Sequence, residues 1–338
     1  MKEPLFGKSL DEIIAIVKEQ GLPAFTARQI AEWLYSHKVN DIDSMSNLSK
    51  KAREGLKMKY TIGRSLFIKQ MESADGTKKY LFPAGDNKSI ESAYIPGENR
   101  NTLCISSQIG CKMGCHFCMT GMQGFQGQLT ATDILNQLVS IEETDNITNL
   151  VYMGMGEPFD NTDNVIKSID ILTADWGFGM SPRRITVSTI GIIPGMKEFL
   201  LRTDAHLAIS LHTPFSEERK KLMPAEKSHP LAEIMKIIKD YDWGRQRRIS
   251  FEYIMFRDVN DSDRHINELS RLLSGLRCRV NLIRFHAAPG LPFESSSDDT
   301  IARFRDKLGA KGIITTIRAS RGEDIMAACG LLSTMEKH

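Results

Sequence analysis

The sequence predicts an α/β fold in which a partial (β/α)6 barrel of the TIM type follows a small helical domain and a short β connector. Three observations predict it. From about residue 100 onward, short β-branched runs alternate with helical patterns, as they do in repeated βαβ units. Right-handed crossovers between parallel strands curl such units into a barrel, and six units are too few to close the complete form. The 338 residues also exceed what one compact domain usually needs.

The composition is that of an ordinary globular protein, with 41% hydrophobic and 25% charged residues. It excludes a disordered chain, a collagen and a coiled coil. The apolar stretches are far shorter than the roughly 18 residues that a membrane span requires, and the N-terminus shows no apolar signal segment. We therefore expect a cytoplasmic protein without membrane contact. The net charge of +2 neither demands nor excludes a nucleic acid as partner.

Residues 1–62 are predicted to form the helical domain, because apolar residues recur there at helical spacing. We expect it to be an accessory domain that binds RNA. The three predicted helices are Leu10–Gln20, Thr26–His37 and Asn47–Tyr60. Residues 63–98 alternate apolar and polar side chains around an Asp75-Gly76 turn, which predicts a connector made of a hairpin or a three-stranded meander. Its predicted strands are Ser65–Met71, Lys78–Phe82 and Ser89–Ile95.

Residues 99–338 are predicted to form the barrel and a C-terminal segment. The six predicted barrel strands are Thr102–Ser106, Asn149–Met153, Arg184–Thr189, His206–Leu211, Ile249–Met255 and Arg279–Phe285. A further β-branched run, Ile313–Arg318, comes near the end. In such barrels the catalytic groups gather at the carboxyl ends of the strands. The unusual segments follow strands one, two, three, four and six: Cys111–Cys118, Gly154–Pro158, Ser188-Thr189, Ser210–His212 and His286.

Three of the six cysteines have the spacing C-x3-C-x2-C, namely Cys111, Cys115 and Cys118. Three thiolates from one loop can converge on a soft metal centre. A 4Fe-4S cubane normally takes four thiolates, so three leave one iron open to a chelator such as the amino and carboxylate groups of S-adenosylmethionine (SAM). Spacing alone leaves open a zinc site with His116 or another residue as fourth ligand.

Beyond this spacing, the sequence resembles a known family. The cysteine loop after a first barrel strand is the signature of radical SAM enzymes. Three longer segments are similar to the adenine-2 RNA methyltransferases among them: Thr102–Cys111, Gly154–Pro158 and Arg321–Gly330. The resemblance runs through nearly the whole chain. It implies a radical SAM barrel, a 4Fe-4S cluster on the three loop cysteines, and dual activity on 23S rRNA and tRNA.

The resemblance also implies roles for three residues outside the cysteine loop. Cys329 matches the cysteine that one SAM methylates, while a second SAM in each turnover is cleaved reductively so that the methyl carbon can reach carbon 2. Cys104 matches the cysteine that resolves the covalent adduct by forming a disulfide, and Glu91 matches the proton acceptor. The division of proton removal between Glu91 and Cys104 stays open. From their neighbours alone, both cysteines would be packing residues and Glu91 a solvated strand carboxylate.

Contacts to SAM are implied at the ends of several strands. The matching residues are Glu157, Pro158, Ser188, Ser210, Leu211, His212 and His286. Gly154 and Gly156 would let the backbone approach the methionyl end of SAM. His286 departs from the family, because many relatives have Asn there. Without the resemblance, the serines could simply cap helices and the two glycines could form a plain turn.

The implied partners are 23S rRNA, tRNA and an electron donor such as a flavodoxin or ferredoxin. Four basic clusters can supply phosphate contacts, although each alone would be an ordinary solvated face. They are Lys50-Lys51 with Arg53, Arg183-Arg184, Lys220-Lys221, and Arg245 with Arg247-Arg248.

Two alternatives remain at this stage. The carbon-8 adenine rRNA methyltransferases of the antibiotic-resistance type share the cysteine chemistry, and Ser181–Arg184 and Ser216–Arg219 resemble them too, whereas Arg321-Gly322 favours carbon 2. A zinc-containing RNA-binding module without catalytic activity is the alternative of a different class.

Overall fold

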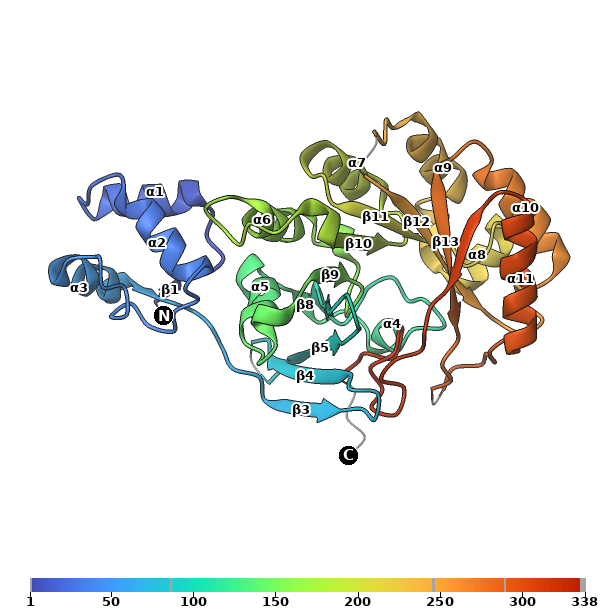
Figure 1. Ribbon diagram of the computed structural model, residues 1–338, viewed down its shortest axis with the longest axis horizontal. Coiled ribbons are helices and arrows are strands. Elements are labelled where there is room, and N and C mark those ends of the chain that lie inside the picture. The colour runs from blue at the N-terminus through green and yellow to red at the C-terminus, as the bar shows by residue number, and fades with distance from the viewer. Residues whose placement is uncertain (1, 86, 245–246, 289, 335–338) are drawn as a thin grey trace.

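The computed structural model describes residues 2–85, 87–244, 247–288 and 290–334. A mixed sheet of ten strands forms its centre (Figure 1). In spatial order the strands are β14 (Ile314–Ile317), β13 (Cys278–Arg284), β12 (Ile249–Met255), β11 (His206–Ser210), β10 (Ile185–Thr189), β9 (Asn149–Tyr152), β6 (Thr102–Ile105), β5 (Ser89–Ile95), β4 (Lys78–Pro83) and β3 (Lys69–Glu72).

The seven strands from β6 to β14 are all parallel, and the described sheet ends at β14 on one side and at β3 on the other. The predicted partial barrel is therefore confirmed, with the run near residue 313 forming its last strand. The strand positions that face the helices are apolar and fully buried, as in Leu207, Phe251 and Val280. The opposite face of the strands is more polar and carries residues such as Ser210, Glu252 and Asn281, which line cavities inside the barrel.

The β-rich segment that the sequence predicts as a connector belongs to the same sheet. Strands β3, β4 and β5 form an antiparallel meander, and β5 pairs with β6 so that Ala93 lies opposite Cys104. The meander thereby extends the open edge of the barrel. Its turn at Asp75-Gly76 reaches the C-terminal segment, because Asp75 accepts a hydrogen bond from the Gly322 N–H at 3.0 Å.

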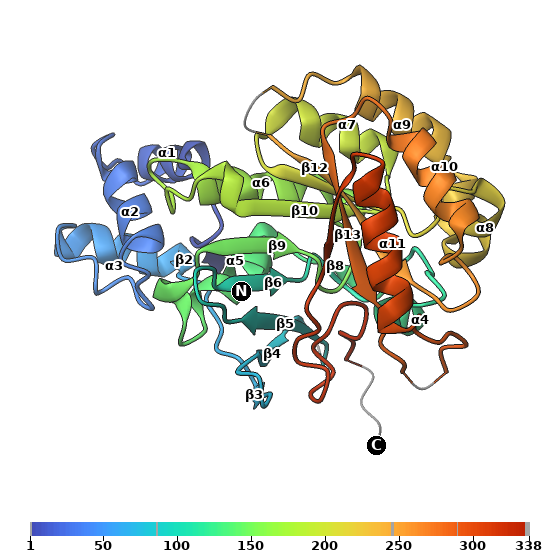
Figure 2. The same ribbon diagram turned by 45° about the vertical axis from the view of Figure 1, so that its right-hand side comes forward.

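Helices cover the outer face of the parallel strands (Figure 2). They are α5 (Ala131–Val139), α6 (Thr162–Thr173), α7 (Ile193–Arg202), α8 (Ser216–Leu222), α9 (Leu231–Asp240), α10 (Asp263–Leu273) and α11 (Asp298–Ala310). Each of the longer ones buries one apolar face, as α10 does with Ile266, Leu269 and Leu273. No helix in the described part of the chain is long and apolar enough to cross a membrane.

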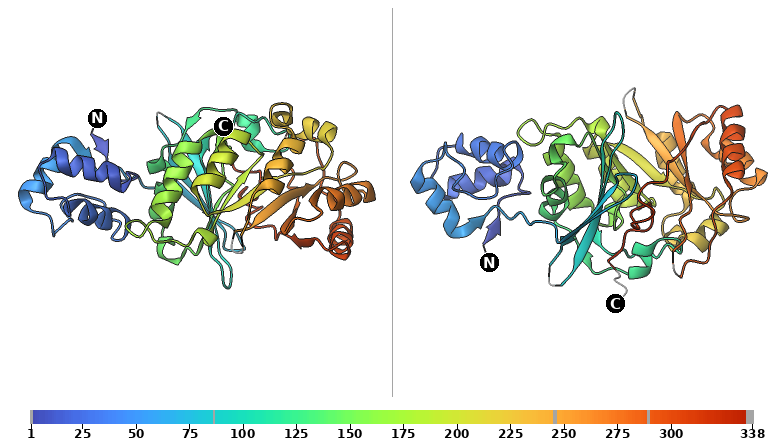
Figure 3. Two further views of the ribbon diagram at one scale, coloured as in Figure 1. Left: turned by 90° about the horizontal axis from the view of Figure 1, so that it is seen from above. Right: turned by 60° about the horizontal axis from the view of Figure 1, so that its bottom comes forward.

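The predicted N-terminal helices form a separate unit at one end of the molecule (Figure 3). Its elements are α1 (Leu10–Glu19), α2 (Thr26–Tyr35), α3 (Lys50–Lys59) and a short parallel pair of β1 (Glu3–Pro4) with β2 (Tyr60–Thr61). Ser9 and Glu12 form a capping box at the start of α1. Tyr35 joins this unit to the barrel, since its ring lies 5.8 Å from that of Trp176 and 5.5 Å from that of Phe178.

Candidate active site

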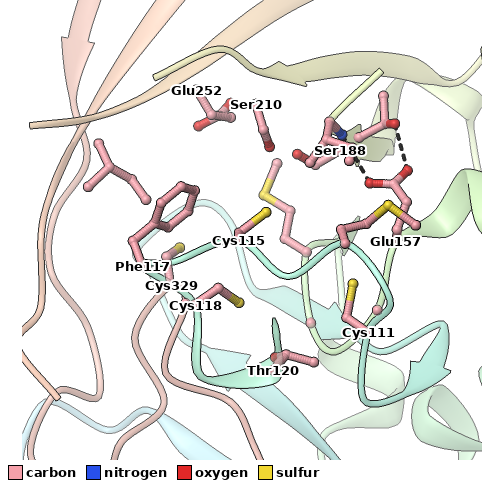
Figure 4. A pocket seen from close by; sticks show the side chains of 18 of the residues that line it. Cys111, Cys115, Phe117, Cys118, Thr120, Glu157, Ser188, Ser210, Glu252 and Cys329 are labelled. Atoms are coloured by element: carbon pink, nitrogen blue, oxygen red, sulfur yellow. Dashed lines mark hydrogen bonds between the residues drawn. The ribbon is translucent and has the colours of Figure 1, made fainter. Parts of the chain in front are cut away.

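One cavity lies at the carboxyl ends of the barrel strands, where the sequence predicts the site (Figure 4). Its free space is about 880 Å³ including the opening to solvent, which lies within the usual range of ligand pockets. Most of the predicted site residues line it together: Cys111, Cys115, Cys118, Gly154, Gly156, Glu157, Ser188, Ser210, His212 and Cys329.

The cysteine loop between β6 and α4 (Met119–Gln123) is held by backbone contacts. The Cys111 N–H donates to the Gly124 carbonyl, and the Cys118 N–H donates to the Cys115 carbonyl at 3.2 Å. Burial raises the pKa of the Cys111 thiol to about 12 and that of Cys115 well above its ordinary value. These thiols are therefore protonated in the metal-free protein, and a metal must displace their protons to bind.

The donor set fits an iron-sulfur cluster. Three thiols from one short loop face the same cavity, and thiolates are the ligands that Fe-S clusters use. His116, the fourth ligand of the alternative zinc site, is exposed and is not among the residues that line the cavity. Within the described residues, no three His, Cys, Asp or Glu side chains stand close enough together to hold a single metal ion.

Glu157 fixes the loop after β9 to the end of β10. Its carboxylate accepts hydrogen bonds from the Thr189 hydroxyl at 2.6 Å, the Ile190 N–H at 3.0 Å and the Phe159 N–H at 3.1 Å. Burial raises the pKa of Glu157 to about 7, although these donors act in the opposite direction. The carboxylate can therefore gain or lose a proton near neutral pH.

The two predicted glycines are required by the protein itself. A Cβ at Gly154 would lie 2.7 Å from the Ile105 carbonyl oxygen, and one at Gly156, whose φ is +99°, would lie 2.5 Å from Cβ of Gln108. The loop after β9 thus packs directly on the loop after β6. The sequence interpretation assigned this close approach to SAM, but the structure shows that the chain's own atoms already impose it.

His212 lines the cavity as a neutral imidazole. Its Nδ1 accepts the Ile254 N–H at 3.0 Å, so the ring proton resides on Nε2. Burial, with a smaller contribution from Arg219, lowers the pKa of His212 to about 3. Phe117 of the cysteine loop packs edge-on against this ring at 4.8 Å, which ties the loop to the wall of the barrel.

A buried ion pair supports the two loops that carry the wall residues. Arg219 and Glu226 are both buried and form a direct ion pair. The Arg219 guanidinium also donates to the carbonyls of Ile190 and Ser210 at 2.7 and 3.1 Å. Arg219 itself is not among the residues that line the cavity. The Ser216–Arg219 stretch therefore supports the cavity wall from behind through Arg219.

We predict that Arg219→Met destabilises the protein by about 3–5 kcal/mol, because the change leaves the Glu226 carboxylate buried without its cation. Urea unfolding followed by circular dichroism measures this difference. The double change Arg219→Met with Glu226→Gln is the control and should recover part of the loss. A single variant as stable as the parent chain would show that the pair does not hold these loops.

The C-terminal segment brings Cys329 into the cavity by docking on α4. The Met119 N–H donates to the Gly330 carbonyl at 2.9 Å, and the Thr120 hydroxyl donates to the Leu332 carbonyl at 2.6 Å. Farther along, the Ser333 N–H donates to Oε2 of Glu91 at 3.0 Å. Cys329 is exposed to the solvent of the cavity, yet protein groups surround it closely enough to raise its pKa.

Glu91 and Cys104 lie behind this segment on neighbouring strands. Glu91 is buried on β5, with its Oε1 3.0 Å from Nζ of Lys79. Burial raises the pKa of Glu91 above its usual value, while Lys79 and the Ser333 N–H lower it. Cys104 is buried on β6, and its raised pKa arises first from burial and then from the neighbouring Cys329 thiol. All six cysteines are free thiols, so a disulfide between Cys104 and Cys329 stays a prediction.

Three predicted contact residues lie away from the cavity wall. Pro158 and Leu211 are buried and are not among the lining residues. His286 is also buried, and its Nδ1 lies 3.4 Å from Oε1 of Glu323 in the C-terminal segment. Cofactor contact by these residues remains a prediction.

Sequence reasoning missed Glu252, a buried carboxylate that lines the cavity from β12. Its Oε1 accepts a hydrogen bond from Asn281 Nδ2 at 2.7 Å, while its buried Oε2 has no hydrogen-bond partner in the described structure. A charged residue at an inward position of the run Ile249–Met255 was the available signal. Such an unpaired oxygen in a cavity is suited to accept a hydrogen bond from a ligand.

Comparisons with known proteins identify similar chains. Residues 105–269 match the model of the radical SAM superfamily, and residues 4–62 match the N-terminal domain of ribosomal RNA large subunit methyltransferases. The chain is 54% identical over 336 residues to the probable dual-specificity RNA methyltransferase RlmN of Bacteroides thetaiotaomicron, covering 99% of this chain and 97% of that protein.

Two further relatives extend the comparison. The dual-specificity RNA methyltransferase RlmN of Syntrophus aciditrophicus is 42% identical over 329 residues, covering 96% of this chain and 94% of that protein. The crystal structure of a radical SAM methyltransferase from Sphaerobacter thermophilus superposes with a TM-score of 0.91 at 38% identity, covering 98% of this chain and 99% of that one.

Proposed function

Since the chain belongs to the RlmN family of radical SAM RNA methyltransferases, we propose that it methylates carbon 2 of an adenosine in 23S rRNA and tRNA through a methylated Cys329. The observation that carries this proposal is the shared cavity, in which Cys329 lies beside the three cysteines of the cluster loop. Cys104 lies close enough to Cys329 for the Cys329 thiol to add to burial in raising the pKa of Cys104.

Membership of the radical SAM superfamily implies a 4Fe-4S cluster and SAM as cofactors. Cys111, Cys115 and Cys118 would hold the cluster, and the wall residues Glu157, Ser188, Ser210 and His212 would contact SAM. When bound, the two cofactors supply the radical chemistry that an adenine C–H carbon requires, because this carbon is too weak a nucleophile to attack a methylsulfonium. We propose that each turnover uses two SAM molecules.

The chain's own residues then carry the methyl carbon and release the product. Cys329 holds the carbon as a thioether and delivers it to carbon 2 of adenine, so that a methylene group joins its sulfur to the base. A base removes the proton from carbon 2, and the unpaired electron of the adduct returns to the cofactors that supplied the radical, so that a closed-shell adduct remains. The Cys104 thiolate attacks the Cys329 sulfur, the S–C bond breaks, and the electron pair left on carbon takes up a proton to complete the methyl group. The resulting disulfide must then be reduced.

Glu91 is suited to the role of proton acceptor. It is buried, its raised pKa makes it a stronger base than an exposed carboxylate, and its contact with the Ser333 N–H ties it to the segment that carries Cys329. Lys79 would hold this carboxylate in place, since its Nζ lies 3.0 Å from Oε1 of Glu91. We propose that a flavodoxin or ferredoxin in the cytoplasm supplies the electrons that regenerate the active enzyme.

We predict that Cys329→Ser retains the cluster and loses RNA methylation, because a serine hydroxyl cannot serve as the methyl carrier. The test expresses the wild-type protein or the variant in a strain that lacks its own enzyme, and digests the 23S rRNA and tRNA for mass spectrometry. Wild type should restore 2-methyladenosine in both RNAs, whereas the variant should restore none. Appearance of 8-methyladenosine instead would identify the carbon-8 activity, and full methylation by the variant would exclude the proposed role of Cys329.

A further inference from the structure

A second cavity lies at the opposite, amino-terminal ends of the barrel strands, and it is rich in arginine. It has about 1740 Å³ of free space including its opening, and strand-start residues such as His206, Ile249 and Arg279 line it. Seven arginines face it: Arg100, Arg183, Arg247, Arg248, Arg277, Arg279 and Arg318. Most enzymes of this barrel class use only the carboxyl ends of the strands, so a charged cavity at the other end requires an explanation.

Two of these arginines have structural roles. Arg247 is buried, and its guanidinium donates to the carbonyls of Ala205 and Leu200 at 3.0 and 3.1 Å. This corrects the interpretation that Arg247 belongs to an exposed phosphate-binding cluster, while Arg245 of the same cluster lies outside the described residues. Arg277 donates to the Gly244 carbonyl at 2.5 Å.

Three others are cations without a counterion. The side chains of Arg100, Arg248 and Arg279 are exposed and make no hydrogen bond or ion pair with any residue that the structure describes. They instead stand close to other positive groups: Arg318 and Arg279 add to burial in lowering the pKa of Arg100. Burial and the nearby arginines, with Arg248 first among them, lower the pKa of His206 to about 4. Such crowding is relieved when an anion binds.

The arginine cavity adjoins the catalytic cavity through a layer of polar side chains. Asn281 lines the arginine cavity and donates to Glu252, which lines the catalytic one. Arg318 lies in the same layer, with its guanidinium 3.5 Å from Oε1 of Glu252. The positive charge of Arg318 acts to lower the pKa of Arg100 on one side and the pKa values of the Cys104 and Cys329 thiols on the other. The two cavities are therefore neighbours across the barrel interior.

We propose that the arginine cavity binds backbone phosphates of the substrate RNA, and that the target adenosine enters the barrel from the amino-terminal ends of the strands. In this arrangement the base passes Arg318 and the unpaired Oε2 of Glu252 to reach the two thiols, while the cofactors occupy the carboxyl ends. The inference rests on the proposed function, and it adds the route by which the RNA enters.

RNA fits this cavity better than an acidic protein does. Guanidinium groups form paired hydrogen bonds with phosphate oxygens, and Trp243 on the cavity wall offers a ring for base stacking. An electron-donor protein must approach the cluster, but the three cluster cysteines line the cavity at the other ends of the strands. A donor docked over the arginines would be separated from them by the barrel interior.

The test compares two triple variants that each remove three positive charges. Arg100→Gln/Arg248→Gln/Arg279→Gln changes the cavity. The control, Lys236→Gln/Lys239→Gln/Arg303→Gln, changes exposed residues on the outer helices α9 and α11. The ligand is an RNA hairpin with an unpaired loop adenosine that the wild-type protein methylates. Its dissociation constant is measured at several salt concentrations, and cluster absorbance confirms that each variant is folded.

The cavity variant should bind the hairpin roughly tenfold or more weakly than wild type at moderate salt, and the slope of log K against log salt should become shallower by about two to three units. The control should stay within about twofold of wild type. A single Arg279→Glu change should also weaken binding, which keeps the test informative if the triple variant does not fold.

Two results would overturn the inference alone. One is a cavity variant that binds RNA as the control does, from a wild-type protein that methylates the hairpin. The other is a cavity variant that keeps its RNA affinity and loses turnover only with flavodoxin, not with dithionite, which would identify a protein-docking surface. If the wild-type protein neither binds nor methylates any hairpin, the proposed function fails, and this inference fails with it.

Discussion

Replacing Cys118 with alanine should abolish both the iron-sulfur cluster and RNA methylation. The three loop cysteines face one cavity, and the described chain offers no fourth thiol in that loop to take the place of Cys118. Two thiolates cannot hold a cubane firmly. Because the cofactors supply the reaction itself, the methylation rate should fall by on the order of 10⁶-fold or more, to background. Iron and sulfide analysis after anaerobic purification, with a methylation assay, measures both effects.

Cys278→Ala is the matched control for this change. Cys278 lies at the start of β13, and it is a partly buried thiol outside the cavity of the cluster loop. Its variant should retain iron and sulfide in near-equal amounts. If Cys118→Ala also retained full iron content, the cluster assignment for the loop would be wrong. Zinc in place of iron in the wild-type protein would point instead to the RNA-binding module without catalytic activity.

Replacing Cys104 with alanine should stop the reaction at a covalent protein–RNA species. Once the methylene carbon joins the Cys329 sulfur to adenine, release requires a second thiol, and Cys104 is the buried thiol beside Cys329. With SAM and a reductant, this variant should accumulate protein that migrates as a shifted band in denaturing gels. Nuclease digestion should remove the shift, and free methylated RNA should fall to background.

The double variant Cys104→Ala with Cys329→Ala separates the two roles. It should form no shifted band, because the carbon cannot be attached to the protein. Peptide mapping of the single variant should place the adduct on Cys329. Normal turnover by Cys104→Ala, or an adduct on a different cysteine, would contradict the roles assigned to both residues.

Much of the fold could be predicted because its signals are local. β12 matches its predicted bounds, and the other barrel strands deviate by one or two residues, since β-branched runs alternate with helices whose periodicity is clear. The meander was predicted from its turn at Asp75-Gly76, but its place at the edge of the barrel was not, because strand pairing between β5 and β6 depends on contacts that no local pattern encodes.

The sequence by itself determined the barrel, the cysteine loop and the family resemblance that singles out Cys104 and Cys329, because residue spacing and motif order are properties of the chain. Only the tertiary structure decided which of these residues share a cavity. It set Cys329 against α4, left Pro158, Leu211 and His286 off the cavity wall, and brought in Glu252. It also collected arginines from loops and strand ends that are far apart in the sequence at the opposite end of the barrel. The physical reason is that a parallel sheet brings residues that are far apart in the sequence together at the same ends of its strands. Their charges and burial therefore depend on neighbours that only the packing of the chain supplies.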